Sequence, residues 1–278
     1  MGTLYLVATP IGNLEDMSPR AVRALREARL IAAEDTRHTR QLLTHFDLHT
    51  PLTSYFEHNK LSKLDAILSA LAEGDVALVS DAGTPGINDP GYELVKEALA
   101  AGYSVSPVPG PSAPVAALAA SGLPTDAFLY LGYLPRKSSD RKAFLRKVGG
   151  LPYTLVFLET PHRLLGSLDD VLDVLGDRPM AVARELTKVH EQFVRGGVRE
   201  VREHFGRHEP RGEFVLIVDG QRERISKRWT EENLLAEIGR ELENGGKARG
   251  ISARLAARSG WSKKEIYSLM NRKSENKK

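Results

Sequence analysis

Short apolar runs alternate with amphipathic segments along the first part of the chain. The apolar runs have the length and composition of buried strands, and the segments between them place apolar residues at helical spacing. The predicted strands cover residues 3–8, 30–33, 76–80 and 104–108, and the predicted helices cover 18–28, 36–46, 60–72 and 89–101. This alternation is typical of a parallel sheet with helices on both faces.

The same kind of pattern starts again after residue 123. Further strands are predicted at residues 128–131, 153–159, 180–184 and 213–218, with helices at 140–148, 163–175 and 198–207 between them. The sequence therefore predicts an α/β protein with two α/β domains, at residues 1–123 and 124–225.

The remaining residues, 226–278, have a different pattern and a different charge. A long amphipathic helix at 230–244 is followed by two short helices around Gly260, and Ser262 with Glu265 forms a capping box. The chain carries a net charge of +3, but residues 221–278 hold 15 Lys and Arg against 8 Glu. This basic helical unit is similar to a helix-turn-helix in which Lys263 and Lys264 contact phosphates, and a purely packing role is the alternative.

The composition excludes several classes of site. The chain has no cysteine, so disulfides, thiolate metal sites and a cysteine nucleophile are excluded, and a cytoplasmic location is expected. No apolar run approaches the length of a membrane helix. The histidines do not cluster at ligand spacing, and no dinucleotide or P-loop motif is present, so we expect no metal and no Rossmann cofactor site.

The loop at residues 80–91, SDAGTPGINDPG, is rich in glycine and proline and follows a predicted buried strand. Its glycines let the backbone approach a ligand closely. Asp89 and Pro90 are interpreted as the start of the next helix, with Asp89 as its N-cap. Other loops at strand ends read TPIGNLEDMSP, AEDTRHTRQ, PGPSAPVAA, ETPHR and ARELTK. Such ends meet at one edge of a parallel sheet, so these loops predict a ligand cleft.

These strings, in this order, closely resemble those of the ribosomal RNA methyltransferases within the tetrapyrrole methylase superfamily, the class III S-adenosylmethionine-dependent methyltransferases. The resemblance covers about residues 4–218. It implies a homodimer of two α/β domains of tetrapyrrole methylase type, with S-adenosylmethionine folded into the cleft. It also implies 2′-O-methylation of a cytidine in the decoding region of small-subunit (16S) rRNA, with naked rRNA or the assembled 30S subunit as partner.

The resemblance further implies the cofactor contacts. Residues 80–88 match the cradle of the methionine part, and Ser112 and Ala113 match the pair beside the ribose. The ends of two later strands, at Leu158 with Glu159 and Glu213 with Phe214, match the lining of the adenine pocket. The expected cofactor-binding residues are Pro10, Ser80, Asp81, Gly83, Thr84, Gly86, Ile87, Ser112, Ala113, Leu158, Glu159, Glu213 and Phe214. Asp81-Ala82-Gly83 replaces the G-D-P string of the tetrapyrrole branch, which argues against a porphyrin-type substrate.

A ribose hydroxyl is a weak acid, so a base should assist its methylation. The candidates are Asp35 and Glu185, with Lys188 as an electrostatic aid; capping of a helix is the alternative role of Asp35. The candidate RNA contacts are Arg37, Arg40, Arg136, Lys137, Arg141 and Lys142, besides Lys263 and Lys264. A small-molecule methylase and a non-enzymatic nucleic-acid-binding protein remain as alternative functions.

Overall fold

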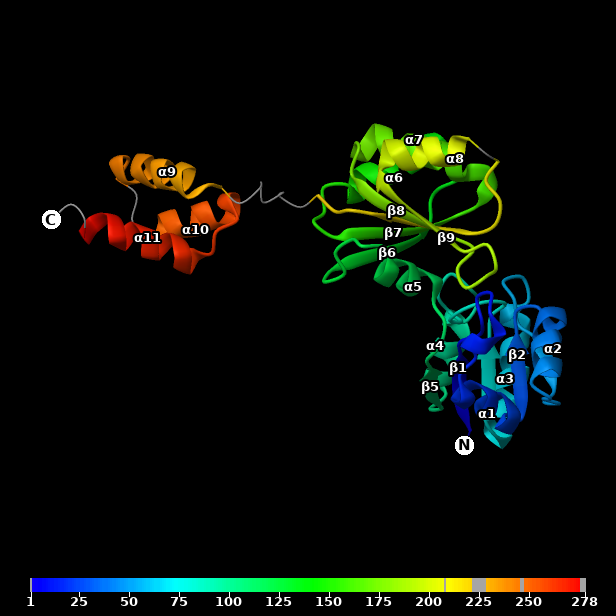
Figure 1. Ribbon diagram of the computed structural model, residues 1–278. Coiled ribbons are helices and arrows are strands. Elements are labelled where there is room, and N and C mark those ends of the chain that lie inside the picture. The colour runs from blue at the N-terminus through cyan, green and yellow to red at the C-terminus, as the bar shows by residue number, and fades with distance from the viewer. Residues whose placement is uncertain (1, 208, 222–228, 246–247, 276–278) are drawn as a thin grey trace. The chain divides into compact units, whose positions relative to one another are not determined.

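The computed structural model describes residues 2–207, 209–221, 229–245 and 248–275. Its contacts divide the chain into two compact units, Met1–Gly220 and Gln221–Lys278. The first unit contains two sheets, each with its own helices, as the sequence predicts, but each sheet has five strands where the sequence predicted four. We call residues 3–112 the N-terminal lobe and residues 113–218 the C-terminal lobe (Figure 1).

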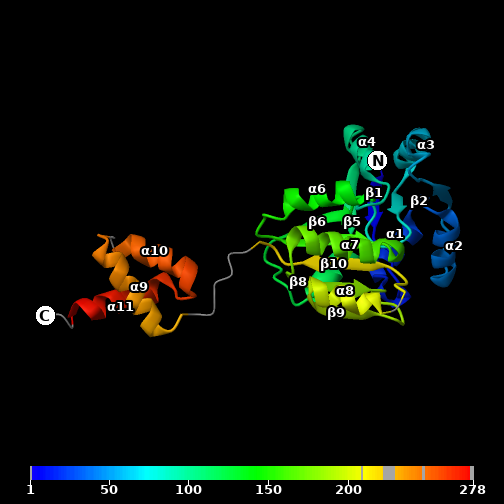
Figure 2. The same ribbon diagram turned by 90° about the horizontal axis from the view of Figure 1, so that it is seen from above.

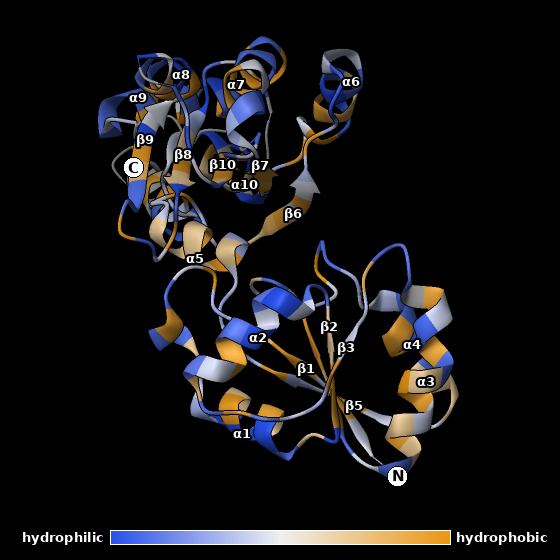
Figure 3. Ribbon diagram, turned by 90° about the vertical axis from the view of Figure 1, so that its right-hand side faces the viewer, coloured by the Kyte–Doolittle hydropathy of each residue, from blue (hydrophilic) through white to orange (hydrophobic). Residues whose placement is uncertain are grey.

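The N-terminal lobe is built on a fully parallel sheet with the strand order β3-β2-β4-β1-β5. Its strands are β1 (Thr3–Val7), β2 (Leu30–Ala33), β3 (Leu52–Ser54), β4 (Val76–Val79) and β5 (Ser104–Val108). Its helices are η1 (Leu14–Asp16), α1 (Pro19–Glu27), α2 (Thr36–His45), α3 (Lys60–Glu73) and α4 (Tyr92–Ala100). Helices α1 and α2 lie on one face and α3 and α4 on the other, each turning its apolar side to the sheet (Figure 3).

The C-terminal lobe has a mixed sheet with the order β6-β7-β10-β8-β9. Its strands are β6 (Phe128–Tyr133), β7 (Thr154–Glu159), β8 (Pro179–Arg184), β9 (Gln192–Gly197) and β10 (Phe214–Val218). Only β6 and β7 pair in parallel, and the other neighbours are antiparallel. The antiparallel pairing of β10 with β7 sets Phe214 opposite Glu159, so the start of one strand meets the end of the other.

Helices cover both faces of this second sheet. They are α5 (Ala113–Ala120), α6 (Ser138–Val148), α7 (Pro161–Leu175) and α8 (Val198–Gly206). Figure 2 shows α6, α7 and α8 on the same face, where they bury the larger core, and α5 packs on the opposite face. The domain boundary at residue 123 stays a prediction, but α5 lies before it in sequence and packs against the second sheet.

The C-terminal unit consists of α9 (Glu231–Glu243), α10 (Ala248–Ser259) and α11 (Lys263–Glu275) around a small apolar core. The predicted capping box is present: the Ser262 N–H donates to Glu265 Oε2 at 2.8 Å, and the Glu265 N–H donates to Ser262 Oγ at 3.2 Å. The indole N–H of Trp261 donates to the Trp229 carbonyl, which joins the entry to α9 with the turn before α11. Within the described residues, no helix is long and apolar enough to cross a membrane.

Candidate functional site

The carboxyl ends of β1, β2, β4 and β5 bring the predicted loops to one edge of the parallel sheet. Two backbone hydrogen bonds connect the loop after β1 to the loop after β4. The Thr9 N–H donates to the Gly83 carbonyl at 2.8 Å, and the Gly83 N–H donates to the Thr9 carbonyl at 3.0 Å. Gly83 has a φ of +84°, a conformation that favours glycine, and it lies against Ile11. These contacts hold the glycine-rich loop beside the turn that follows β1.

A cleft of about 250 Å³ lies between this edge and the C-terminal lobe. Most of the predicted cofactor residues line it, namely Asp81, Gly83, Thr84, Ile87, Ser112, Ala113, Leu158, Glu159, Glu213 and Phe214. Pro10 and Ser80 instead line a neighbouring cavity, and Gly86 lines neither. Sequence reasoning missed Ile11, Glu34, Asp89, Pro114, Tyr130, Tyr133, Leu186 and Val215.

Three carboxylates from the N-terminal lobe, Glu34, Asp81 and Asp89, line the cleft. Burial, together with the charges of Glu34 and Asp81, raises the pKa of Asp89 to about 6, although Ser80 donates a hydrogen bond to it. Burial, helped by the charges of Asp81 and Asp35, also raises the pKa of Glu34. Among the described residues no lysine or arginine forms an ion pair with any of the three. Of the described residues, only the His38 imidazole lies within ion-pair distance, with its Nδ1 4.0 Å from Asp81 Oδ1, so most of the negative charge at this edge is uncompensated.

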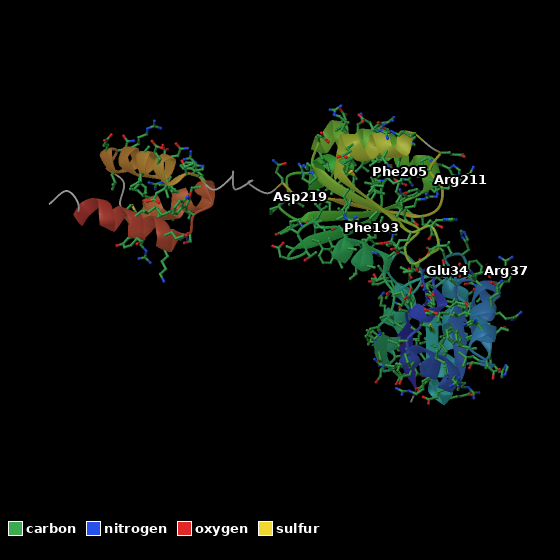
Figure 4. The ribbon with its side chains drawn as sticks, in the orientation of Figure 1. Glu34, Arg37, Phe193, Phe205, Arg211 and Asp219 are labelled. Carbon is green, nitrogen blue, oxygen red and sulfur yellow. The ribbon has the colours of Figure 1, made fainter. Side chains whose placement is uncertain are left out.

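The position of Asp89 corrects the prediction that it caps α4. The helix begins at Tyr92 with Gly91 as N-cap, so the Asp89 carboxylate faces the cleft instead. Figure 4 shows Glu34 at the end of the N-terminal lobe that faces the second sheet.

Two tyrosines of β6, Tyr130 and Tyr133, supply aromatic surface to the same cleft. Burial raises the pKa of the Tyr130 phenol to about 12 and raises that of Tyr133 as well. Both phenols are therefore neutral at physiological pH and can donate a hydrogen bond or pack against a ring, but they cannot act as bases.

The carboxylates that the C-terminal lobe brings to the site have cationic partners. Glu159 has no exposed side-chain surface, pairs with Arg163 at 3.2 Å and accepts a hydrogen bond from Ser167 Oγ at 2.6 Å. Lys188 Nζ lies 2.9 Å from Glu185 Oε1 and 3.1 Å from Glu213 Oε2. On this side of the cleft the three carboxylates are thus paired with two cations, Arg163 and Lys188, which compensate most of their charge.

Glu185 and Lys188, predicted from the ARELTK string, stabilise each other's charge. Burial opposes the charge of Glu185, but hydrogen bonds from Lys188 and the Glu213 N–H outweigh it, so the pKa of Glu185 is lowered. For Lys188, burial is likewise outweighed by its two carboxylate partners, and its pKa is raised. Lys188 reaches a cavity wall, whereas Glu185 lies behind it and lines neither cavity.

Asp35, the other candidate base, caps α2. Its Oδ1 accepts a hydrogen bond from the Arg37 N–H at 2.8 Å, and its Oδ2 pairs with the Arg37 guanidinium at 2.7 Å. These contacts hold the pKa of Asp35 far below its usual range. The side chain lies in a shallow depression beside Phe56 and lines neither cavity. The geometry favours the capping role, and its role as a base stays an untested prediction.

The second cavity, of about 390 Å³, adjoins the cleft. Ile11, Asp81, Ala82 and Glu213 line both spaces. The other lining residues come mainly from the β1 loop, α2 and the loop after β8, namely Pro10, Gly12, Leu14, His38, Thr39, Gln41, Leu42, Ser80 and Lys188. A ligand in the cleft and a second ligand in this cavity would meet at Asp81 and Ala82.

The predicted RNA contacts divide into exposed and buried residues. Most of them are exposed: Arg37, Arg40, Arg136, Lys137, Lys263 and Lys264. Arg141 corrects the prediction, because its guanidinium is buried, pairs with the buried Asp170 at 2.6 Å and donates to carbonyls of the loop before α6. Lys142 pairs with Asp173 at 2.8 Å. Arg141 thus anchors α6 to α7 and is not available to a phosphate.

Within the residues that the structure describes, no group of three or more His, Cys, Asp or Glu side chains is placed to hold a metal ion.

Comparison with known proteins identifies the family. The family model of the tetrapyrrole (corrin/porphyrin) methylases matches residues 3–202. Ribosomal RNA small subunit methyltransferase I of Halalkalibacterium halodurans is 46% identical over 273 residues, covering 96% of this chain and 94% of that protein. The protein of the same name from Synechocystis sp. is 45% identical, with 97% of each chain covered.

The chain belongs to the ribosomal RNA small subunit methyltransferase I family of tetrapyrrole methylases. The resemblance stated from the strand-end loops is thereby confirmed, and so is the enzyme class, a methyltransferase.

Solved structures of other tetrapyrrole methylases confirm the fold of this family member. The methyltransferase CobJ matches with a TM-score of 0.60 at 20% identity, over 80% of this chain and 95% of that one. The uroporphyrin-III C-methyltransferase from Thermus thermophilus, solved with S-adenyl homocysteine, matches with a TM-score of 0.54 at 24% identity, over 78% of this chain and 97% of that one.

Proposed function

We propose that the protein transfers a methyl group from S-adenosylmethionine to the 2′-hydroxyl of a cytidine in the decoding region of small-subunit (16S) rRNA. The observation that carries the proposal is the cleft itself, whose N-terminal edge is acidic and unneutralised, in a chain that shares 45–50% identity with proteins named ribosomal RNA small subunit methyltransferase I.

The residues of the cleft fit this cofactor. S-adenosylmethionine supplies an activated methyl group and carries positive charge on its sulfonium and its amino group. The negative charges of Glu34, Asp81 and Asp89 repel one another, and a cation bound between them relieves this repulsion. The apolar and aromatic side chains of Leu158, Phe214 and Tyr130 give the opposite wall the character that an adenine ring needs.

The chain's own contribution to the chemistry is positioning and electrostatics. Methyl transfer requires the acceptor oxygen and the methyl carbon to be held close and in line. The acceptor oxygen would form its bond to the methyl carbon as the bond between that carbon and sulfur breaks, and the hydroxyl proton would pass to water. A fixed positive charge stabilises the oxygen while this occurs. Lys188 supplies that charge from the wall of the second cavity, beside Glu213, which lines both spaces, and Glu185 is the positioning residue that holds its ammonium group.

The substrate is then the rRNA itself or the assembled 30S subunit, met in the cytoplasm, and the active form is a homodimer. Exposed basic side chains just before α6, on Arg136 and Lys137, and others in the C-terminal unit would contact the phosphate backbone.

The test is methyl transfer to small subunits isolated from cells that lack this enzyme. Purified protein with S-adenosylmethionine should produce one ribose-methylated cytidine, identified by nuclease digestion and mass spectrometry. Methylation of a base rather than a ribose, or of a tetrapyrrole instead of the subunit, would refute the proposal. Subunits from cells that contain the enzyme are the control, because their site is already methylated.

A further inference from the structure

We infer that the second cavity, beside the cleft, is the pocket for the extruded acceptor nucleoside and that Gln41 binds its base. The inference rests on the proposed function and adds the location of the acceptor and a residue that recognises it. The residues that carry the argument are His38, Gln41 and Leu42 of α2, with Asp81, Gly12 and Lys188.

The position of the cavity is the first argument. It shares Asp81, Ala82, Ile11 and Glu213 with the cleft, so the two spaces have a common wall. A methyl group can pass between two bound molecules only when the reacting atoms come to about 3–3.5 Å. Enzymes that do chemistry on a base take the nucleotide out of the stack and hold it in a pocket, and the same extrusion would bring a ribose hydroxyl to the cofactor. A space of about 390 Å³ that opens onto the cofactor cleft meets both requirements.

The face of α2 that lines the cavity is the second argument. His38, Gln41 and Leu42 follow one another at helical spacing, so they lie on one face of the helix. The Gln41 side chain is exposed to solvent, and its amide forms no hydrogen bond with the described residues. An amide has two donors and one acceptor, which matches the paired donor and acceptor on a base edge. Leu14 and Leu42 offer apolar surface to the base ring.

The opposite wall of the cavity explains a glycine of the β1 loop. A Cβ at Gly12 would lie 2.4 Å from Cγ of Lys188 and 2.9 Å from Oγ1 of Thr187. Only a residue without a side chain lets the Lys188 stem cross this loop, and the crossing brings the Lys188 ammonium group to the cavity. The cavity thus has the Gln41 amide on α2, which can form hydrogen bonds with a base, and the positive charge of Lys188 beside Glu213.

The experiment compares Gln41→Leu with Thr44→Val in the full-length protein. Leucine keeps the bulk of Gln41 and removes the amide, whereas Thr44 is an exposed residue of the same helix that lines neither cavity. The measurements are kcat/KM for methylation of unmethylated small subunits, the Kd of S-adenosylmethionine by calorimetry, and the melting temperature.

We expect Gln41→Leu to lower kcat/KM for the subunit roughly ten- to a hundredfold, the range that one paired contact to a base gives. The Kd of the cofactor and the melting temperature should stay unchanged, and Thr44→Val should behave as the wild type. A Gln41→Leu variant with unchanged kcat/KM overturns the inference. So does an equal loss in both variants, or a loss explained by weaker cofactor binding. A wild-type protein that methylates no subunit refutes the proposed function itself, which separates the two failures.

Discussion

The two sides of the cofactor cleft carry similar numbers of carboxylates but treat them in opposite ways. On the N-terminal side, Glu34 and Asp89 have raised pKa values, and no described lysine or arginine pairs with them. On the C-terminal side, Glu159 is paired with Arg163, and Glu213 with Lys188. Paired carboxylates hold structure in place, whereas unpaired ones leave negative charge for a ligand to neutralise. Under the proposed function, we expect the N-terminal edge to meet the charged part of the cofactor and the C-terminal edge to serve as scaffold.

Lys188→Met is the change from which we expect the largest effect. Loss of the ammonium group removes the positive charge near the acceptor oxygen, so turnover at saturating substrates should fall about 10²- to 10³-fold, as for other fixed electrostatic groups. Cofactor affinity should not fall, because the cleft only becomes more acidic. Single-turnover rates and calorimetry measure the two quantities. Arg202→Met, which breaks the exposed ion pair between Arg202 of α8 and Asp169 of α7, is the matched control and should leave both unchanged. A Lys188 variant with normal turnover would contradict the assigned role.

Asp81→Asn and Glu213→Gln test the two sides directly, because both residues line both cavities. Asp81 belongs to the unpaired side, so its loss should weaken S-adenosylmethionine binding roughly ten- to a hundredfold, the range of a hydrogen bond to a charged group. Glu213 is already paired with Lys188, and its side chain is 80% exposed, so its replacement should change the Kd less than threefold. Equal effects of the two variants on the Kd would remove the distinction between the sides.

Asp89 makes the charge on the N-terminal side of the cleft depend on pH. Its pKa of about 6 means that the carboxylate becomes neutral as the pH falls below that value, so cofactor affinity should decrease severalfold between pH 7 and pH 5. The stability of the ligand-free protein should change in the opposite sense. An unfolded chain ionises this group near pH 4, so the contribution of Asp89 to stability is lost as the pH rises from about 4 to 6. Calorimetry and thermal melts across this range measure both effects, and Asp89→Asn should flatten both curves.

The smallest effect is expected outside the cleft, in the basic C-terminal unit. Lys263 and Lys264 line a shallow groove with Arg249 and Tyr267. If they contact phosphates, replacing both by glutamine should weaken RNA binding severalfold and reduce the slope of log affinity against log salt by about two. Filter binding at several salt concentrations measures the slope. Arg240→Gln, which breaks a pair with Glu237 on α9, is the control. An unchanged slope with a lower melting temperature would favour the packing role of this unit.

The hydrophobic pattern predicted eight of the ten strands in the described residues, because their apolar runs are strong or clearly bounded. The two strands that it missed, β3 and β9, are edge strands. β3 and β9 lie at the edges of their sheets and have mostly half-buried residues, so their sequences lack a continuous apolar run. The pattern also could not give the strand directions in the second sheet. Those directions depend on which strands pair, and the pairing of β10 with β7 is a contact between residues more than fifty positions apart.

The cleft was predictable where a loop sequence is distinctive, as in residues 80–91. It was not predictable where a side chain's role depends on a helix start or on the second lobe. Asp89 has the sequence of an N-cap before Pro90, and only the later start of α4 directs it to the cleft. Tyr130 and Tyr133 belong to a strand whose alternation indicates a sheet face but not the ligand that the face meets. Arg141 has the sequence of a basic surface, and its burial depends on Asp170, which lies on another helix.

The bridge between Thr9 and Gly83 has a mechanical consequence. Thr9 immediately precedes the loop that lines the second cavity, and Gly83 belongs to the loop that lines the cleft. Two mutual backbone hydrogen bonds connect the loops, and a third runs from Thr9 Oγ1 to the Ser80 carbonyl. We therefore expect the two loops to open together. The amide protons of Thr9 and Gly83 should therefore exchange with solvent at one common rate. A cofactor bound in the cleft would slow both exchange rates together. It would therefore also make the loop at the second cavity more rigid before any acceptor binds.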